Sequence, residues 1–135
     1  MVGKGVYKIT AADEVTFTGP TSSKLKKFTI DSTVKLIDGK EYKVTAIAAN
    51  AFKANKKLTS VTIGENVASI GKNAFNGCKK LKTINVKTEL LTTKNVGAGA
   101  FKGIKKKATF KVPVSMKKAY KKLFTKKGAK KPKVK

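Results

Sequence analysis

One apolar pattern recurs along this chain every 23 residues and constrains its fold more than any other feature. The pairs Ala51-Phe52 and Ala74-Phe75 occupy equivalent positions, and the strings Leu58–Ile63 and Leu81–Val86 follow them at the same distance. A looser third unit follows after a three-residue insertion, with Ala100-Phe101 in the same place. A regular repeat of this length predicts a solenoid, in which each unit forms one coil of a stack.

The strings after each Ala-Phe pair indicate how such coils would pack. Alternate residues of a strand point to opposite faces, so the apolar ones would point inward while Thr62 and Asn85 point outward. One coil cannot bury its own inner face, and stacked neighbours bury it jointly. We therefore expect Phe52, Phe75 and Phe101 to form an aromatic ladder. The period and the L-x-x-L-x-L pattern predict a β-rich leucine-rich-repeat solenoid of short parallel strands with turns and short helical segments.

The string Ile70–Leu81, IGKNAFNGCKKL, indicates a subtype. It resembles the BspA-like leucine-rich repeats, which occur in surface proteins of bacteria and of some mucosal protists, and the match covers residues 44–112. The chain departs from that family at Asn55 and Ile104, where cysteine is common, and at Lys107, which replaces the repeat leucine. The resemblance implies a non-enzymatic binding or scaffold module for adhesion or protein contact in a secreted or cell-surface bacterial protein.

The residues outside the repeats are predicted to close the two ends of the stack. Period-two alternation and a turn at Asp38-Gly39 indicate a β-strand cap that includes a hairpin. About two and a half to three repeats of 23–26 residues follow, then an amphipathic helix, then a basic segment that has almost nothing apolar to bury. The predicted boundaries are residues 1–43 for the cap, 44–113 for the repeats, 114–127 for the capping helix and 128–135 for a basic flexible tail.

The predicted C-terminal helix has one apolar and one basic face. Ser115 is the expected N-cap residue, and the apolar face is expected to cover the open end of the stack. The other face carries Lys117, Lys118, Lys121 and Lys122. A helix of this kind can also lie on anionic lipid, which is the alternative interpretation, without stable membrane insertion.

Charge is the second unusual property of the chain. It contains 32 lysines and arginines against 7 acidic residues, for a formal net charge of +25, and every one of the 32 is lysine. Lysine pairs recur at equivalent corners of successive units, where they would repeat roughly every 5 Å along the stack. Together with the helix lysines they form the candidate polyanion patch: Lys56, Lys57, Lys79, Lys80, Lys105, Lys106, Lys117, Lys118, Lys121 and Lys122.

The composition argues against catalysis and against a cofactor or metal. The chain has no histidine to activate Cys78, its only cysteine, and one cysteine forms neither an intrachain disulfide nor a multi-cysteine metal site. No apolar run reaches the roughly 18 residues that a membrane span needs. Met1–Lys4 does not open a signal peptide, so we expect a fragment of a longer surface protein, with a cytoplasmic protein as the alternative.

Two functions are compatible with these patterns. In the first, a protein or glycan ligand binds a polar concave face formed by outward residues of the repeat strands and their neighbours: Thr59, Ser60, Thr62, Thr83, Asn85, Thr109 and Lys111. In the second, the lysines bind a polyanion such as nucleic acid, teichoic acid, glycosaminoglycan or acidic lipid. Weak, salt-sensitive polyanion binding is expected in either case. We expect a monomer.

Overall fold

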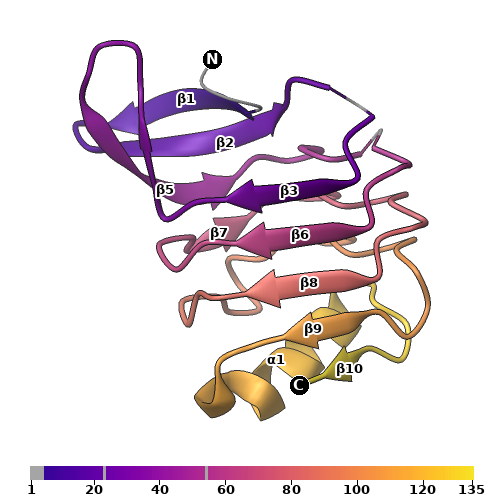
Figure 1. Cartoon of the computed structure of the whole chain (residues 1–135). Helices are drawn as coiled ribbons and strands as arrows, with labels where there is room; N and C mark the ends of the chain where they lie inside the picture. The colour runs from indigo at the N-terminus through magenta and orange to yellow at the C-terminus, as the bar shows by residue number, and fades with distance from the viewer. Residues whose placement is uncertain (1–4, 23, 54) are drawn as a thin grey trace.

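The chain coils into a stack with one long sheet along its side (Figure 1), in a computed structural model that describes residues 5–22, 24–53 and 55–135. This sheet, called here the repeat sheet, has the strand order β10-β9-β8-β6-β3, and neighbouring strands run parallel. Its strands are β3 (Lys27–Ile30), β6 (Ser60–Ile63), β8 (Thr83–Val86), β9 (Thr109–Lys111) and β10 (Lys133–Val134). The predicted solenoid of short parallel strands is confirmed.

A second sheet forms the N-terminal end and the back of the stack. Its strand order is β1-β2-β5-β4, and β7 also pairs with β5. The antiparallel pairs β1–β2 and β4–β5 are hairpins, and the second turns at the predicted Asp38-Gly39, where the Gly39 amide donates to the Leu36 carbonyl at 2.9 Å. The strands are β1 (Gly5–Ala11), β2 (Glu14–Pro20), β4 (Thr33–Lys35), β5 (Glu41–Ile47) and β7 (Ser69–Ile70).

The core is built around the expected aromatic ladder. The Phe75 ring stacks between Phe52 at 5.0 Å and Phe101 at 5.3 Å, with 9° between the ring planes in both pairs. The structure adds Phe17 beyond Phe52 and Phe124 beyond Phe101, so the ladder continues into both end segments. All five rings are fully buried. The ladder therefore ties the N-terminal hairpin and the C-terminal helix to the repeats.

Successive coils are joined by the same backbone hydrogen bond. The Phe52 amide donates to Ala74 at 2.7 Å, the Phe75 amide to Ala100 at 2.8 Å, and the Phe101 amide to Lys127 at 3.0 Å. Lys127 thus takes the place that Ala74 and Ala100 hold in the earlier coils. The residues after it form a further, shorter coil.

This coil corrects the prediction of a flexible tail at residues 128–135. The segment includes β10, whose Lys133 amide donates to the Ala108 carbonyl at 2.9 Å. The Lys135 amide donates to Phe110 at 2.9 Å, and Ala129 is 4% exposed. The prediction was wrong because it considered only side chains. The unpaired backbone groups of β9 supply partners that a lysine-rich strand can use as well as an apolar one.

A 3-10 turn at Val114–Met116 leads into helix α1 (Lys117–Lys126). The expected N-cap role of Ser115 is wrong: Met116 is the N-cap residue and makes no side-chain capping bond, because the 3-10 turn moves the start of the helix past Ser115. The Ser115 hydroxyl instead donates to Glu89 Oε1 at 2.7 Å. This bond joins the start of the helix to the loop after β8.

The apolar side of α1 packs onto the last coils. Tyr120, Leu123 and Phe124 are buried, and the Tyr120 hydroxyl donates to the Thr88 carbonyl at 2.7 Å. The same hydroxyl accepts from the Leu91 amide at 3.3 Å. A buried hydroxyl with two partners incurs little of the cost of an unpaired polar group. The helix is thus held by both packing and hydrogen bonds.

Candidate binding face

The outward side chains of the repeat sheet lie in rows that run across its strands. Thr62 of β6 is paired with Asn85 of β8, and Asn85 with Lys111 of β9. The Asn85 Nδ2 donates to Thr62 Oγ1 at 3.4 Å, which links two coils through side chains. The adjacent row consists of Ser60, Thr83 and Thr109. The structure thus brings these six predicted residues onto one face of one sheet.

Thr59, the seventh predicted residue, lies just before β6, and its hydroxyl donates to the Lys26 carbonyl at 3.0 Å. The rows also extend to two strands outside the predicted repeats. Thr29 of β3 is paired with Thr62, and Lys133 of β10 with Thr109. The string Phe28-Thr29-Ile30 of β3 repeats the apolar-Thr-Ile pattern of β6, and the structure confirms the likeness.

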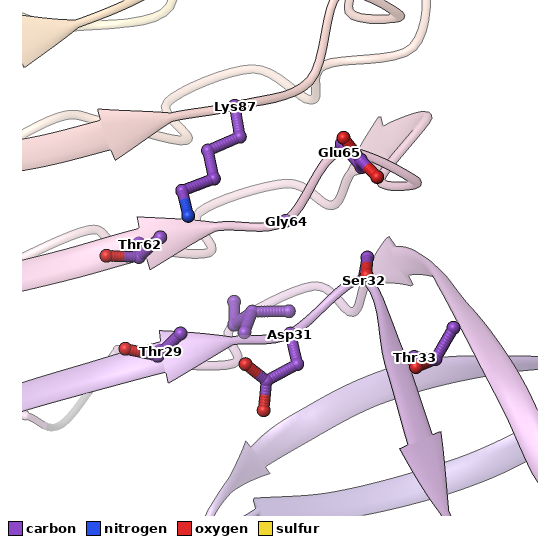
Figure 2. Close-up of a pocket in the computed structure, with 9 residues that line it drawn as sticks. Thr29, Asp31, Ser32, Thr33, Thr62, Gly64, Glu65 and Lys87 are labelled. Carbon is purple, nitrogen blue, oxygen red and sulfur yellow. The ribbon is translucent and has the colours of Figure 1, made fainter.

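A hollow of about 410 Å³ opens where β3 and β6 end (Figure 2). In Figure 2 the Lys87 side chain extends from the end of β8 across the end of β6, while Asp31 and Glu65 come from the loops that follow β3 and β6. The hollow combines carboxylates, one ammonium group and several hydroxyls. Its lining residues are Thr29, Ile30, Asp31, Ser32, Thr33, Thr62, Gly64, Glu65 and Lys87.

A second hollow of about 600 Å³ adjoins the first and extends toward the C-terminal end of the sheet. The two share Thr29, Thr62 and Lys87, so they form one depression, called here the outer groove. Its floor provides hydroxyl and amide groups that donate and accept hydrogen bonds. Beyond the shared residues, the second hollow is lined by Asn85, Val86, Lys111, Val112 and Pro113.

The structure divides the predicted polyanion patch into two parts. Six of its lysines are exposed in the turns that precede β6, β8 and β9: Lys56, Lys57, Lys79, Lys80, Lys105 and Lys106. The other four, Lys117, Lys118, Lys121 and Lys122, lie on α1, which follows the opposite end of β9. The helix lysines are therefore not a continuation of the coil-corner lysines.

The acidic residues gather at the opposite ends of the strands. Asp31, Glu65 and Glu89 lie in the loops that follow β3, β6 and β8. The other four, Asp13, Glu14, Asp38 and Glu41, lie at the turns of the β1–β2 and β4–β5 hairpins. Figure 1 shows both turns on the side to which the arrowheads of β3, β6 and β8 point. All seven acidic residues thus lie at the end of the strands opposite the coil-corner lysines, where Lys87 and the start of α1 also lie.

Cys78 is fully buried, and its thiol donates to the Phe52 carbonyl at 3.1 Å. Loss of solvent raises the pKa of this thiol to about 12. The thiolate is the reactive form of cysteine, so the group is inert at neutral pH.

We expect a water-soluble disulfide reagent at pH 8 to leave the native protein unmodified and to modify one thiol per chain in denaturant. Rapid modification of the native protein would contradict this packing.

Over residues 5–22, 24–53 and 55–135, no group of three or more histidine, cysteine, aspartate and glutamate side chains is arranged to hold a metal ion. Within the same residues, no helix has the length and apolarity needed to cross a membrane. The groups that do converge are the hydroxyl, amide, ammonium and carboxylate groups of the outer groove. This is the chemistry of hydrogen-bonded recognition.

Comparison with known proteins places the repeats in a family. Residues 45–131 match a family model described as "BspA type Leucine rich repeat region (6 copies)". None of the curated proteins matches the chain.

Three solved structures share the fold. A leucine-rich cell surface protein from Faecalibacterium prausnitzii is 25% identical, with a TM-score of 0.62 over 84% of this chain and 36% of its own. A leucine-rich repeat protein from Bacteroides ovatus is 24% identical, with a TM-score of 0.62 over 84% of this chain and 35% of its own. A leucine-rich repeat protein from Bacteroides capillosus is 23% identical, with a TM-score of 0.60 over 85% and 82%. The chain therefore spans only about a third of the first two.

Proposed function

Because this chain belongs to the BspA-type leucine-rich repeat proteins, we propose that it is a non-enzymatic binding module whose ligand lies in the outer groove. The observation that carries the proposal is the continuity of that groove. It runs from the loop after β3 to Pro113 after β9, so that several coils contribute to it. A solenoid provides an extended surface of this kind because each coil adds one strand to it.

The chemistry of the groove suits a polar, extended ligand. Thr29, Thr62 and Asn85 offer neutral hydrogen-bonding groups at the strand spacing of about 4.8 Å. Asp31, Glu65 and Lys87 add two negative charges and one positive charge near the N-terminal part. A peptide segment or a glycan carries alternating donors and acceptors that fit such a surface. Adhesion or protein contact at a bacterial cell surface is the role we propose, supported by the similar cell surface protein of Faecalibacterium prausnitzii.

We also propose that the two end segments act as caps. At the C-terminal end, α1 buries Tyr120, Leu123 and Phe124 against the last coils. At the N-terminal end, Phe17 of β2 packs on Phe52 at 5.2 Å. Terminal segments of this kind are what a short solenoid needs to cover its otherwise open apolar ends.

The proposal is tested with a double substitution in the groove floor, Thr62→Ala and Asn85→Ala. Wild-type and variant protein are screened on arrays of glycans and of extended peptides, and every hit is then titrated in solution. The loss of two hydrogen-bonding groups is expected to weaken a genuine ligand by about tenfold or more.

A matched control is Ser69→Ala with Thr45→Ala, which removes two hydroxyls from the other sheet. It is expected to leave the affinity of the ligand unchanged. A ligand whose affinity changes equally in both variants does not bind the groove. A ligand that is lost only when lysines are removed at the coil corners would also contradict the proposal.

A further inference from the structure

Every strand of the repeat sheet is preceded, at the same distance, by a lysine. The register pairs Lys27 with Ser60, Ser60 with Thr83, Thr83 with Thr109, and Thr109 with Lys133. Counting back three residues from each of these five positions gives a lysine in every case. We call this set the lysine column: Lys24, Lys57, Lys80, Lys106 and Lys130.

The backbone keeps these corners aligned from coil to coil. The Thr59 amide donates to the Lys26 carbonyl at 2.7 Å, and the Lys82 amide donates to Thr59 at 3.0 Å. At the last coil the Lys107 amide donates to the Lys130 carbonyl at 3.0 Å. Neighbouring strands lie about 4.8 Å apart, so five coils set the ends of the column roughly 19 Å apart.

All five lysines of the column are exposed, and the turns and strands around them contain no acidic residue. Two unit charges about 5 Å apart repel by roughly 0.8 kcal/mol even in water. An aligned column maximises this repulsion, whereas scattered lysines would avoid it. The column therefore lowers the stability of the unliganded protein, and an anion of matching length would remove that penalty.

We propose that the lysine column binds one extended, flexible chain of phosphates laid along the axis of the stack. This site is separate from the outer groove and does not depend on the function proposed for it. A single file of ammonium groups matches a single chain. The positions Lys56, Lys79 and Lys105 widen the positive strip by one residue in the three middle coils.

The side chains available favour phosphate over nucleic acid bases. Lysine is a compact point charge that binds phosphate without the planar fork of arginine, which is absent from the chain. Single-stranded nucleic acids are usually held by bases stacked on aromatic rings. All seven phenylalanines here are buried, as are Tyr42 and Tyr120. The bound chain is thus recognised through the spacing of its charges along one flexible chain and not through bases.

The test compares two triple variants with the same net charge. The column variant is Lys57→Gln, Lys80→Gln and Lys106→Gln, and the control variant is Lys118→Gln, Lys121→Gln and Lys122→Gln on α1. Titration with inorganic polyphosphate at physiological salt is expected to show a loss of roughly 10- to 100-fold in the column variant. The affinity of the control variant is expected to change by less than about threefold, since its lysines only add to the overall positive potential of the protein.

Chain length supplies a second readout. Affinity for wild-type protein is expected to rise with polyphosphate length until the chain spans about 19 Å and then to level off. Poly(glycerol phosphate) is titrated in parallel, so that a polyol phosphate and inorganic polyphosphate are distinguished as sources. Equal losses in the two variants would overturn the proposal. The proposal would also be overturned if heparin oligosaccharides or duplex DNA bound wild type as tightly as polyphosphate does and lost the same affinity in the column variant.

Thermal unfolding at low salt gives a readout that needs no ligand. The column variant is expected to melt at a higher temperature than wild type, because it lacks the aligned repulsion. Added polyphosphate is expected to raise the melting temperature of wild type more than that of the column variant. A column variant that melts below wild type at low salt would contradict the repulsion argument.

The Thr62→Ala, Asn85→Ala variant is expected to bind polyphosphate with wild-type affinity, which separates this proposal from the one made for the outer groove.

Discussion

Replacing Phe75 with alanine is expected to lower the free energy of unfolding by about 3–5 kcal/mol. The ring is fully buried and stacks on Phe52 and Phe101 with 9° between planes, so its removal leaves a cavity in the middle of the ladder. Single domains are stable by only about 5–15 kcal/mol, so this loss is a large share of the total. Urea denaturation followed by circular dichroism measures it.

The conservative change Phe75→Leu serves as the control. It keeps most of the buried apolar area but removes both stacked contacts, and it is expected to cost clearly less than alanine. A loss below about 1 kcal/mol for Phe75→Ala would mean that the coils repack around position 75. That result would contradict a close-packed ladder.

The second large effect is expected from Gly71→Ala. A Cβ atom at position 71 would lie 2.2 Å from the backbone nitrogen of Ala49 and 2.6 Å from the Ala48 carbonyl carbon. These are backbone atoms of the preceding coil, and they cannot rotate away as a side chain would. The two coils would have to separate and strain the bond from the Gly71 amide to the Ile47 carbonyl, 2.7 Å in length. We expect a loss of about 3 kcal/mol, measured by urea denaturation.

Gly39→Ala is the matched control for this glycine. Gly39 has a φ of +81° in the β4–β5 turn, and a Cβ there would meet nothing within 4 Å. Its substitution is expected to cost only the left-handed backbone penalty of roughly 1–2 kcal/mol. If Gly39→Ala proved as destabilising as Gly71→Ala, the close approach of the coils would not be the cause.

The parts of the fold that repeat in the sequence could be predicted from it. The Ala-Phe pairs and alternating strings have identical surroundings in each coil, so the same side chains recur at the same spacing. Phe52, Phe75 and Phe101 were found in this way, as were Thr62 and Asn85 on the outward face. Repetition strengthens this signal because the same structural requirement selects the same residue types in every coil.

The unpredicted parts depend on backbone pairing or on residues outside the repeat. β10 is held to β9 by backbone hydrogen bonds, which leave no mark on the sequence of a lysine-rich segment. Lys24 and Lys130 belong to the lysine column only because β3 and β10 join the sheet. Lys24 precedes Lys57 by 33 residues, outside the repeat spacing, and Lys130 is followed by Lys131 where the repeat has Leu81. Only the strand register shows that both are equivalent to Lys57.

Likewise, only part of the candidate site could be predicted from the sequence. The outward residues of β6 and β8 follow from strand alternation. The groove, however, needs Asp31, Glu65 and Lys87, which come from loops after three different strands. Asp31 and Glu65 are 34 positions apart in the sequence, and Glu65 and Lys87 are 22 positions apart. The repeat places Glu65 and Lys87 near equivalent strand ends, but no pattern in the sequence indicates that they line a common hollow with Asp31.

The segregation of charge across the stack has a consequence for how the molecule approaches a surface. With the lysine column at one end of the strands and all seven carboxylates at the other, charge is distributed unevenly along the strand direction. Near a negatively charged surface, the resulting torque turns the lysine column toward that surface before contact is made. The hairpin turns and the Asp31 part of the outer groove then face the medium. In this orientation the lysine column contacts the surface, and the outer groove remains accessible to a second partner.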